Sequence, residues 1–151
     1  MLDVEAPESM DAYVGQVLGP GEWVTVTQAM IDAFAEATGD HQWIHVDVAR
    51  AAREMPGGRT IAHGYLTLSL LPYLSHSVLR IRNRSRGLNY GANRVRFTAP
   101  VPSGSRIRVR QVLKAAEPVT GGRRLVFEAT VEIEGETRPA LVAETISMVF
   151  A

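Results

Sequence analysis

The sequence predicts an α+β domain in which a mainly antiparallel sheet wraps around one long apolar helix. Two observations lead to this prediction. The stretch at residues 62–77 is apolar on almost every helical face, whereas the second half of the chain alternates apolar and polar residues with the period of β-strands. A helix of this kind has to be covered on nearly every side, and a curled sheet with one apolar face can cover it.

The composition fits one folded domain without a highly charged partner. Basic and acidic side chains number 16 each, so the formal net charge is zero, which argues against a general affinity for nucleic acid or anionic membranes. The absence of cysteine excludes disulfides, thiolate nucleophiles and cysteine-ligated zinc. No repeat, low-complexity tract or linker divides the chain. We therefore expect residues 1–151 to form a single domain, with roughly the first ten residues less ordered.

We expect a soluble, cytoplasmic protein. The N-terminal residues, Met-Leu-Asp-Val-Glu-Ala-Pro-Glu, lack the basic start and the apolar core of a signal peptide. The most apolar stretch, residues 61–79, contains His63, Pro72 and His76 and is interrupted by Ser and Thr. This pattern favours a buried helix over a membrane span.

The first half of the chain predicts a short strand and two helices. The strand is expected at residues 22–25. Thr27 is then placed to cap a helix that ends at Gly39, where a left-handed conformation is cheap. Asp47 can cap a shorter helix that runs through Glu54. Apolar residues of the first helix recur at helical spacing: Met30, Ile31, Phe34 and Ala37.

Two irregularities are predicted in the later elements. Pro72 lies inside the apolar helix and removes one backbone hydrogen bond, so we expect a kink there. In the strand after the helix, the alternation that includes Leu88 resumes in the opposite phase after Gly91, which indicates a bulge. A turn is expected at residues 100–104, a hairpin turn at Gly135, and a last strand at residues 140–150.

The long strands carry opposite charges on their polar faces. Arg106, Arg108 and Arg110 alternate with apolar residues on one strand, and Glu128, Glu132 and Glu134 do so on the next. We expect these two faces to pair across neighbouring antiparallel strands. A long apolar helix inside such a sheet is the hot-dog architecture. One copy leaves strand edges and helix surface exposed, so we also expect a homodimer.

The segment between the first two helices is the richest in chemical groups. Asp40 and His45 are five residues apart, so a loop can turn both side chains toward one point. A carboxylate and a histidine together can take a proton from water and deliver one to carbon. On spacing alone the more common interpretation is structural, with Asp40 capping a turn and His45 held by a hydrogen bond.

A metal site is a further interpretation of the same segment, because Asp40, His41 and His45 cluster in the sequence and His63 can join them. His41 and His45 share a face only if the segment is helical, and Gly39 argues against a helix. Metal sites also usually show clearer ligand spacing. We therefore expect no metal ion here.

A second candidate segment, residues 59–65, leads into the apolar helix. A helix begins with free N–H groups that can stabilise negative charge developing on a thioester oxygen, and Gly64 would allow close approach to the backbone. His63 and Tyr65 are further candidates for substrate contact. The alternative, equally favoured, is that Gly64 permits tight packing and His63 caps the helix.

Arginines supply candidate contacts for the phosphates of a coenzyme A or acyl-carrier-protein arm. Arg94 and Arg96 are the main candidates, with the three arginines of the next strand as further ones. Such residues more often form a solvated strand face. Trp43 is expected to pack at the loop, and His76 is expected to be structural.

Three motifs give the chain a family resemblance. They are Ala37-Thr-Gly-Asp40-His-Gln-Trp-Ile-His45-Val-Asp47, then Ile61-Ala-His-Gly64, then Val95-Arg-Phe-Thr-Ala-Pro-Val101. In order and spacing they resemble the MaoC-like dehydratases, which include the (R)-specific enoyl-CoA hydratases, and most closely the nodulation protein N-like branch. The resemblance covers most of the chain, and the combination of motifs is more specific than either half alone.

The resemblance implies a hot-dog homodimer that hydrates trans-2-enoyl thioesters to (R)-3-hydroxyacyl thioesters. Residues matching Asp40 and His45 would hold and activate the water, with Asp40 as base, and the N–H of Gly64 would polarise the thioester carbonyl. No cofactor is implied beyond the coenzyme A or acyl carrier protein of the substrate. Gln42 and Trp43 replace the Asn-Pro common in the family, and Pro72 stands where some relatives have a serine.

Two other functions stay open at this stage. A hot-dog thioesterase would often use a carboxylate on the central helix, and residues 62–77 contain no Asp or Glu. A non-catalytic acyl-thioester-binding protein, or a subunit of a hetero-oligomer, would not need both Asp40 and His45.

Overall fold

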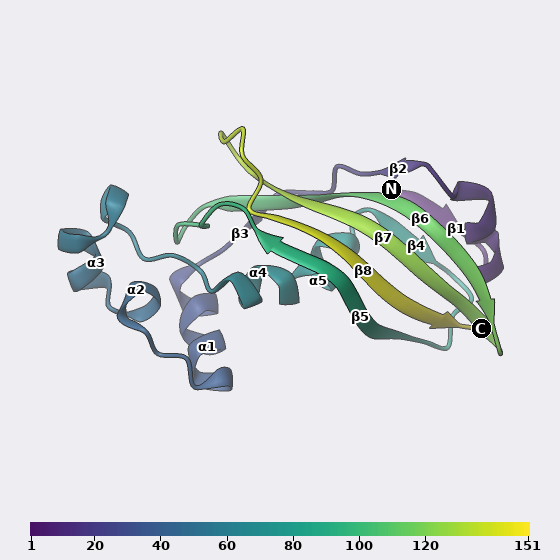
Figure 1. The fold of residues 1–151 in the computed structure, drawn as a ribbon, viewed down its shortest axis with the longest axis horizontal. Coiled ribbons are helices and arrows are strands. Elements are labelled where there is room, and N and C mark those ends of the chain that lie inside the picture. Colours follow the sequence, from purple (N-terminus) through teal and green to yellow (C-terminus); the bar gives the residue numbers. More distant parts are fainter.

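The computed structural model describes residues 1–151 and shows a curved antiparallel sheet that covers a central helix (Figure 1). The sheet has six strands, with β2-β6-β7-β8-β5 as its main order and β3 also paired to β6. The strands are β2 (Val17–Leu18), β3 (Val24–Thr25), β5 (Arg86–Phe97), β6 (Arg106–Val119), β7 (Gly122–Ile133) and β8 (Leu141–Phe150). The predicted hot-dog fold is confirmed.

The central helix is divided into α4 (Gly64–Ser69) and α5 (Leu71–Ser75). Pro72 lies in the first turn of α5, which confirms the predicted kink. Leu66 and Leu74 are buried, but Tyr65 and Tyr73 are exposed. One copy of the chain therefore leaves part of the helix surface exposed, as expected for a single hot-dog domain. Four residues at helical spacing form its exposed stripe: Tyr65, Ser69, Pro72 and Tyr73.

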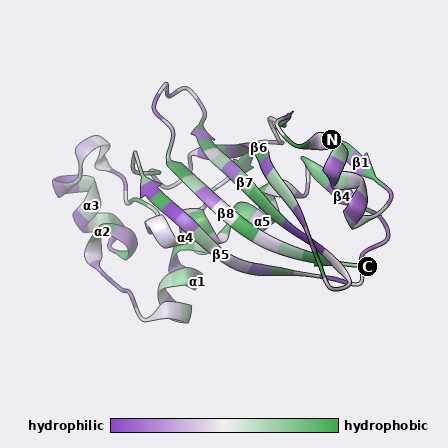
Figure 2. Ribbon diagram, turned by 45° about the vertical axis from the view of Figure 1, so that its right-hand side comes forward, coloured by the Kyte–Doolittle hydropathy of each residue, from purple (hydrophilic) through white to green (hydrophobic).

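The sheet separates an apolar inner face from a charged outer face, and hydrophobic and hydrophilic residues alternate along its strands (Figure 2). The inner side chains of β6 and β7, such as Ile107 and Val131, are fully buried. On the outer face Arg108 Nε lies 2.6 Å from a carboxylate oxygen of Glu132. Arg106 pairs with Glu134, and Arg110 with Glu132, so the predicted pairing of the two charged faces is confirmed.

Strand β5 forms one edge of the sheet and pairs only with β8. Its register shifts between Asn89 and Gly91 and again between Ala92 and Arg94, which confirms the predicted bulge. Most β5 residues are exposed. The edge therefore has no neighbour within one copy of the chain.

Three short helices lie together beyond one end of the sheet (Figure 1). They are α1 (Gln28–Thr38), α2 (Trp43–Val46) and α3 (Val48–Glu54), and the turn η2 (Pro56–Gly58) follows. Thr27 and Asp47 cap α1 and α3 as predicted. The sequence does not predict α2, which has only four residues. No helix in the structure has both the length and the apolar character needed to cross a bilayer.

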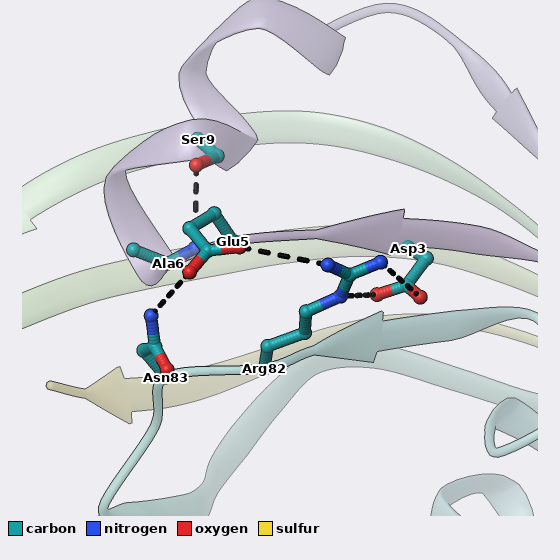
Figure 3. Close-up of polar contacts among 6 residues, drawn as sticks. All are labelled: Asp3, Glu5, Ala6, Ser9, Arg82 and Asn83. Carbon is teal, nitrogen blue, oxygen red and sulfur yellow. Dashed lines mark hydrogen bonds and ion pairs between the residues drawn. The ribbon is translucent and has the colours of Figure 1, made fainter.

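The N-terminal residues form elements that the sequence does not predict. Strand β1 (Leu2–Val4) pairs in parallel with β4 (Leu79–Ile81), and the 3-10 helix η1 (Pro7–Tyr13) follows. Figure 3 shows the polar contacts of this segment: Arg82 bonds both carboxylate oxygens of Asp3, and Asn83 bonds Glu5. Met10 is completely buried. The segment expected to be less ordered is thus packed against the rest of the chain.

Candidate active site

Asp40 lies in the loop directly after α1. Gly39 ends the helix in the left-handed conformation with φ 78°, and its N–H donates to the Ala35 carbonyl. The chain turns there, and Asp40 Oδ1 accepts a 3.3 Å hydrogen bond from the Gln42 N–H. Asp40 is exposed. The local turn therefore holds the carboxylate in place, while the carboxylate stays accessible to solvent.

His45 lies on α2 and is 93% buried, with a relative exposure of 7%. Its Nδ1 is 2.7 Å from the carbonyl oxygen of Ile61. A carbonyl only accepts, so Nδ1 carries the hydrogen and a neutral His45 has a bare lone pair at Nε2. The structure thus selects the nitrogen of His45 that is free to act on a substrate or a water molecule.

His63 packs directly against His45. The two rings stack with centroids 3.8 Å apart and an angle of 24° between their planes. His63 Nε2 is 2.9 Å from the main-chain carbonyl oxygen of Asp40. His63 occupies the N-cap position of α4, but its side chain does not bond the N–H groups of that helix.

The structure brings the side chains of Asp40, His45 and His63 together. One ligand-type atom from each lies within 4.8 Å of the other two. The nearly parallel histidine rings do not favour a shared metal ion, because one ion cannot lie in both ring planes at bonding distance. His41 is not part of this group, since it lies 3.5 Å from Glu36 on the surface. The arrangement suits a water molecule and protons better than a metal.

Gly64 begins α4 next to the two histidines. Its N–H has no acceptor within the chain, as expected for the first residue of a helix. A Cβ at this position would lie 2.7 Å from Cδ2 of Phe97, so the ring of Phe97 requires glycine here. Tyr65 is exposed and meets Phe97 edge to face, with ring centroids 5.6 Å apart.

Gln28 holds the site together, but no feature of the sequence predicts this role. Its Nε2 donates to the His45 carbonyl at 2.8 Å, and its Oε1 accepts from Thr60 Oγ1 at 2.5 Å. The second hydrogen of Nε2 reaches Asp32 at 2.9 Å, so both N–H groups of the amide are used. A polar residue in the first turn of a helix is common, and only the folded chain shows that this one bridges α1, α2 and the segment before α4.

The arginines are not gathered at this group. On β5, Arg94 and Arg96 alternate with Phe97 and therefore face away from Gly64. Arg106, Arg108 and Arg110 are engaged with glutamates on the outer face of the sheet. Trp43 lies under the guanidinium of Arg50, 3.9 Å from the ring centroid, and links α2 to α3. His76, at the end of α5, contacts Tyr73.

A groove of about 820 Å³ runs along α4 and α5. Its walls come from the helix, from β5 and from the inner faces of β7 and β8, and include Leu68, Leu88 and Phe127. It does not include Asp40, His45 or His63. It begins one helical turn beyond Gly64, so it can receive a chain that extends past Asp40 and His45.

The fold and this group define a class of protein: a hot-dog domain with a carboxylate and two histidines at the start of its central helix. A family model, the MaoC-like domain, matches residues 9–137. The chain belongs to the MaoC-like dehydratase family. This membership confirms the resemblance predicted from the three motifs.

Individual relatives agree with this membership. 3-Hydroxyacyl-thioester dehydratase Z of Mycobacterium tuberculosis is 47% identical over 147 residues, which cover 97% of each chain. Nodulation protein N of Rhizobium leguminosarum bv. viciae is 54% identical over 139 residues, which cover 90% of this chain and 86% of that protein. The unliganded structure of R-hydratase PhaJ1 from Pseudomonas aeruginosa has a TM-score of 0.72 at 24% identity, covers 90% of this chain and 81% of that chain, and shares the fold.

Proposed function

We propose that this chain catalyses the reversible addition of water to a trans-2-enoyl thioester, giving the (R)-3-hydroxyacyl thioester. One observation carries the proposal. The Asp40 carboxylate, the free Nε2 of His45 and the unbonded N–H of Gly64 surround the start of the central helix. These are the groups that a hydration at an activated double bond requires.

The chemistry follows from the hydrogen-bonding capacity of each group. Asp40 accepts a proton from water as the water oxygen bonds to C3 of the substrate. The electrons of the double bond move toward the thioester oxygen, where the Gly64 N–H stabilises the negative charge. A protonated His45 Nε2 then delivers a proton to C2. Return of the proton from Asp40 to His45 restores the starting state, and no cofactor enters the balance.

The relatives support the substrate class. Dehydratase Z is named for 3-hydroxyacyl thioesters, and PhaJ1 is named as an R-hydratase. The (R) configuration is a proposal for this chain, as is the carrier, which can be coenzyme A or an acyl carrier protein. Arg94 and Arg96 stay predicted contacts of the carrier phosphates.

Two alternatives have less support. A thioesterase that used a carboxylate on the central helix would find none there, since α4 and α5 contain no Asp or Glu. A non-catalytic binding protein would have no need for a buried histidine whose tautomer is fixed beside a carboxylate. A catalytic role explains both the fixed tautomer of His45 and its position beside Asp40.

We also propose a homodimer. Ser69 and Pro72 of the exposed stripe line the same groove as Leu88 and its neighbours on the unpaired edge of β5. A second copy can cover both surfaces.

The direct test is the loss of enoyl-thioester absorbance with crotonyl-CoA and with a longer trans-2-enoyl-CoA. Chiral analysis of the product and titration of free thiol are run on the same samples. Formation of (R)-3-hydroxyacyl-CoA without free thiol supports the proposal. Free thiol would support the thioesterase alternative, and binding without turnover would support the non-catalytic one.

A further inference from the structure

We propose that His63 is the positioning residue of this site: it fixes the main chain of Asp40 by a hydrogen bond and the ring of His45 by stacking. It does so without contributing an atom to the reaction. The inference rests on the proposed function, because it assigns Asp40 and His45 as the reacting pair.

The hydrogen bond to Asp40 is the first support. The other hydrogen bonds of Asp40 are local: its N–H reaches Thr38 Oγ1 at 3.4 Å, and its carboxylate accepts from Gln42. The bond from His63 spans 23 residues and ties the exposed loop to the start of the central helix. Without it, Asp40 would be held only by its own turn.

The stacking on His45 is the second support. His63 is 97% buried, with a relative exposure of 3%, and it also contacts Phe34 of α1 with ring centroids 4.9 Å apart. The ring is thus fixed by α1 and by the chain before α4. His45 packs against it at 3.8 Å, so the position of His63 limits the tilt of the His45 ring.

The tautomer of His63 is the third support. Nε2 must carry the hydrogen that it donates to the Asp40 carbonyl, so this N–H is not available to a thioester oxygen. Nδ1 is buried and has no hydrogen-bond partner within the chain. A buried acceptor without a donor lowers stability, and such a group persists where it serves function. His63 therefore acts on the catalytic pair and not as the oxyanion contact that the sequence suggested.

Two variants separate these contributions. His63→Leu removes both contacts together with the unpartnered Nδ1. We expect kcat to fall by about 100-fold, as for a small displacement of reacting groups, with KM for crotonyl-CoA little changed and the melting temperature equal or higher. His63→Gln keeps an N–H donor within reach of the Asp40 carbonyl and should recover part of kcat. His41→Gln, at an exposed histidine that lies against Glu36 and outside both the group and the groove, is the matched control and should behave as wild type.

The outcomes distinguish this inference from the proposed function. Unchanged kcat in His63→Leu, or a raised KM with unchanged kcat, would overturn the positioning role while leaving the hydratase intact. Nitrogen NMR of the imidazoles gives a readout that does not depend on activity. We expect a neutral His63 protonated at Nε2, and protonation at Nδ1 alone would refute the proposal even if no substrate were turned over.

Discussion

The directions of a few hydrogen bonds decide which atoms of single residues are free to react. His45 and His63 each use one N–H on a main-chain carbonyl, of Ile61 and Asp40 respectively. In the neutral state, the acceptors that remain for a water molecule are Nε2 of His45 and the Asp40 carboxylate. Such a set orients a water molecule through its hydrogens, and it needs one additional proton before it can act as an acid.

Asp40→Asn tests the base directly. The amide keeps the size of the side chain and an oxygen that can accept from Gln42, but it cannot take a proton from water. We expect turnover to fall at least about 100-fold, with an unchanged melting temperature. Glu36→Gln removes the charge of an exposed carboxylate on α1 and should leave the rate unaltered. Hydration by Asp40→Asn at nearly the wild-type rate would remove Asp40 from the mechanism.

Gly64→Ala tests the contact between Phe97 and the start of α4. The added Cβ would meet the Phe97 ring at 2.7 Å, so we expect the free energy of unfolding to fall by about 1–3 kcal/mol. Gly91→Ala is the matched control, because no atom lies within 4 Å of a Cβ there. In the double variant with Phe97→Leu, stability should return in part. A single variant as stable as wild type would show that Phe97 moves aside freely.

Motifs predict the proposed reacting residues better than the residues that hold them. Asp40, His45 and Gly64 are visible as chemical groups at suggestive spacing next to a helix start. Gln28 is not, because its role depends on bringing α1 against Thr60, 32 residues away. The positioning role of His63 also depends on a tautomer that only its partner atoms determine.

At the scale of secondary-structure elements, the site is built from short pieces held by side chains. Helix α2 has four residues, too few to be stable alone, and its carbonyl at His45 is held by Gln28. The placement of His45 therefore depends on contacts between α1, α2 and the segment before α4.

Gln28→Met tests this dependence, since methionine keeps the shape of the side chain but not its hydrogen bonds. The buried partners on Thr60 and His45 lose their bonds, so we expect unfolding free energy to fall by about 1–3 kcal/mol. Turnover should fall as His45 shifts. Asp32→Ala removes only the outward hydrogen bond of the same amide and serves as the control. Full activity in Gln28→Met would show that α2 is placed by packing alone.

Element length decides what periodicity can predict. The strands β5 to β8 and the helix α1 have 10 to 14 residues and strong periodicity, and the sequence predicts them. The elements β1, β2, η1 and α2 are short or irregular and are stabilised by distant partners, such as Val78, whose carbonyl accepts from the Leu2 N–H. Local sequence carries little information about such elements.

At the scale of the whole molecule, the ion pairs on the outer face of the sheet make stability depend on pH. The hydrogen bond from Arg108 holds the pKa of Glu132 below its ordinary value of 4.5; burial opposes this and Arg110 adds to it. A lowered folded-state pKa stabilises the protein above pH 4.5, and this contribution is lost as the pH falls through the folded-state value.

Glu132→Gln should therefore reduce the loss of stability below pH 4.5 and slightly lower the melting temperature at neutral pH. Thermal melts across the acid range measure both effects. Glu128→Gln, on the same strand but outside any ion pair, is the control. If the melting temperature of the variant fell with acid pH just as that of the wild type does, these pairs would contribute nothing to the pH dependence.

The proposed dimer also belongs to this scale. Sedimentation or light scattering should give twice the mass of the chain. Tyr73→Glu places a charge on the exposed stripe of the central helix and should shift the protein toward monomer, whereas Val48→Glu, on an equally exposed apolar residue of α3, should not. A monomeric wild-type protein at micromolar concentration would contradict the proposal.

Hydration in water labelled with ¹⁸O tests the central claim most directly. Crotonyl-CoA is incubated with the wild-type protein and with Asp40→Asn, and the products are analysed by mass spectrometry. The account predicts one ¹⁸O atom on C3 of a 3-hydroxybutyryl-CoA formed by the wild type, with formation strongly reduced in the variant. Label found in the carboxylate of a free acid would contradict it. So would the formation of equal amounts of labelled 3-hydroxybutyryl-CoA by both proteins.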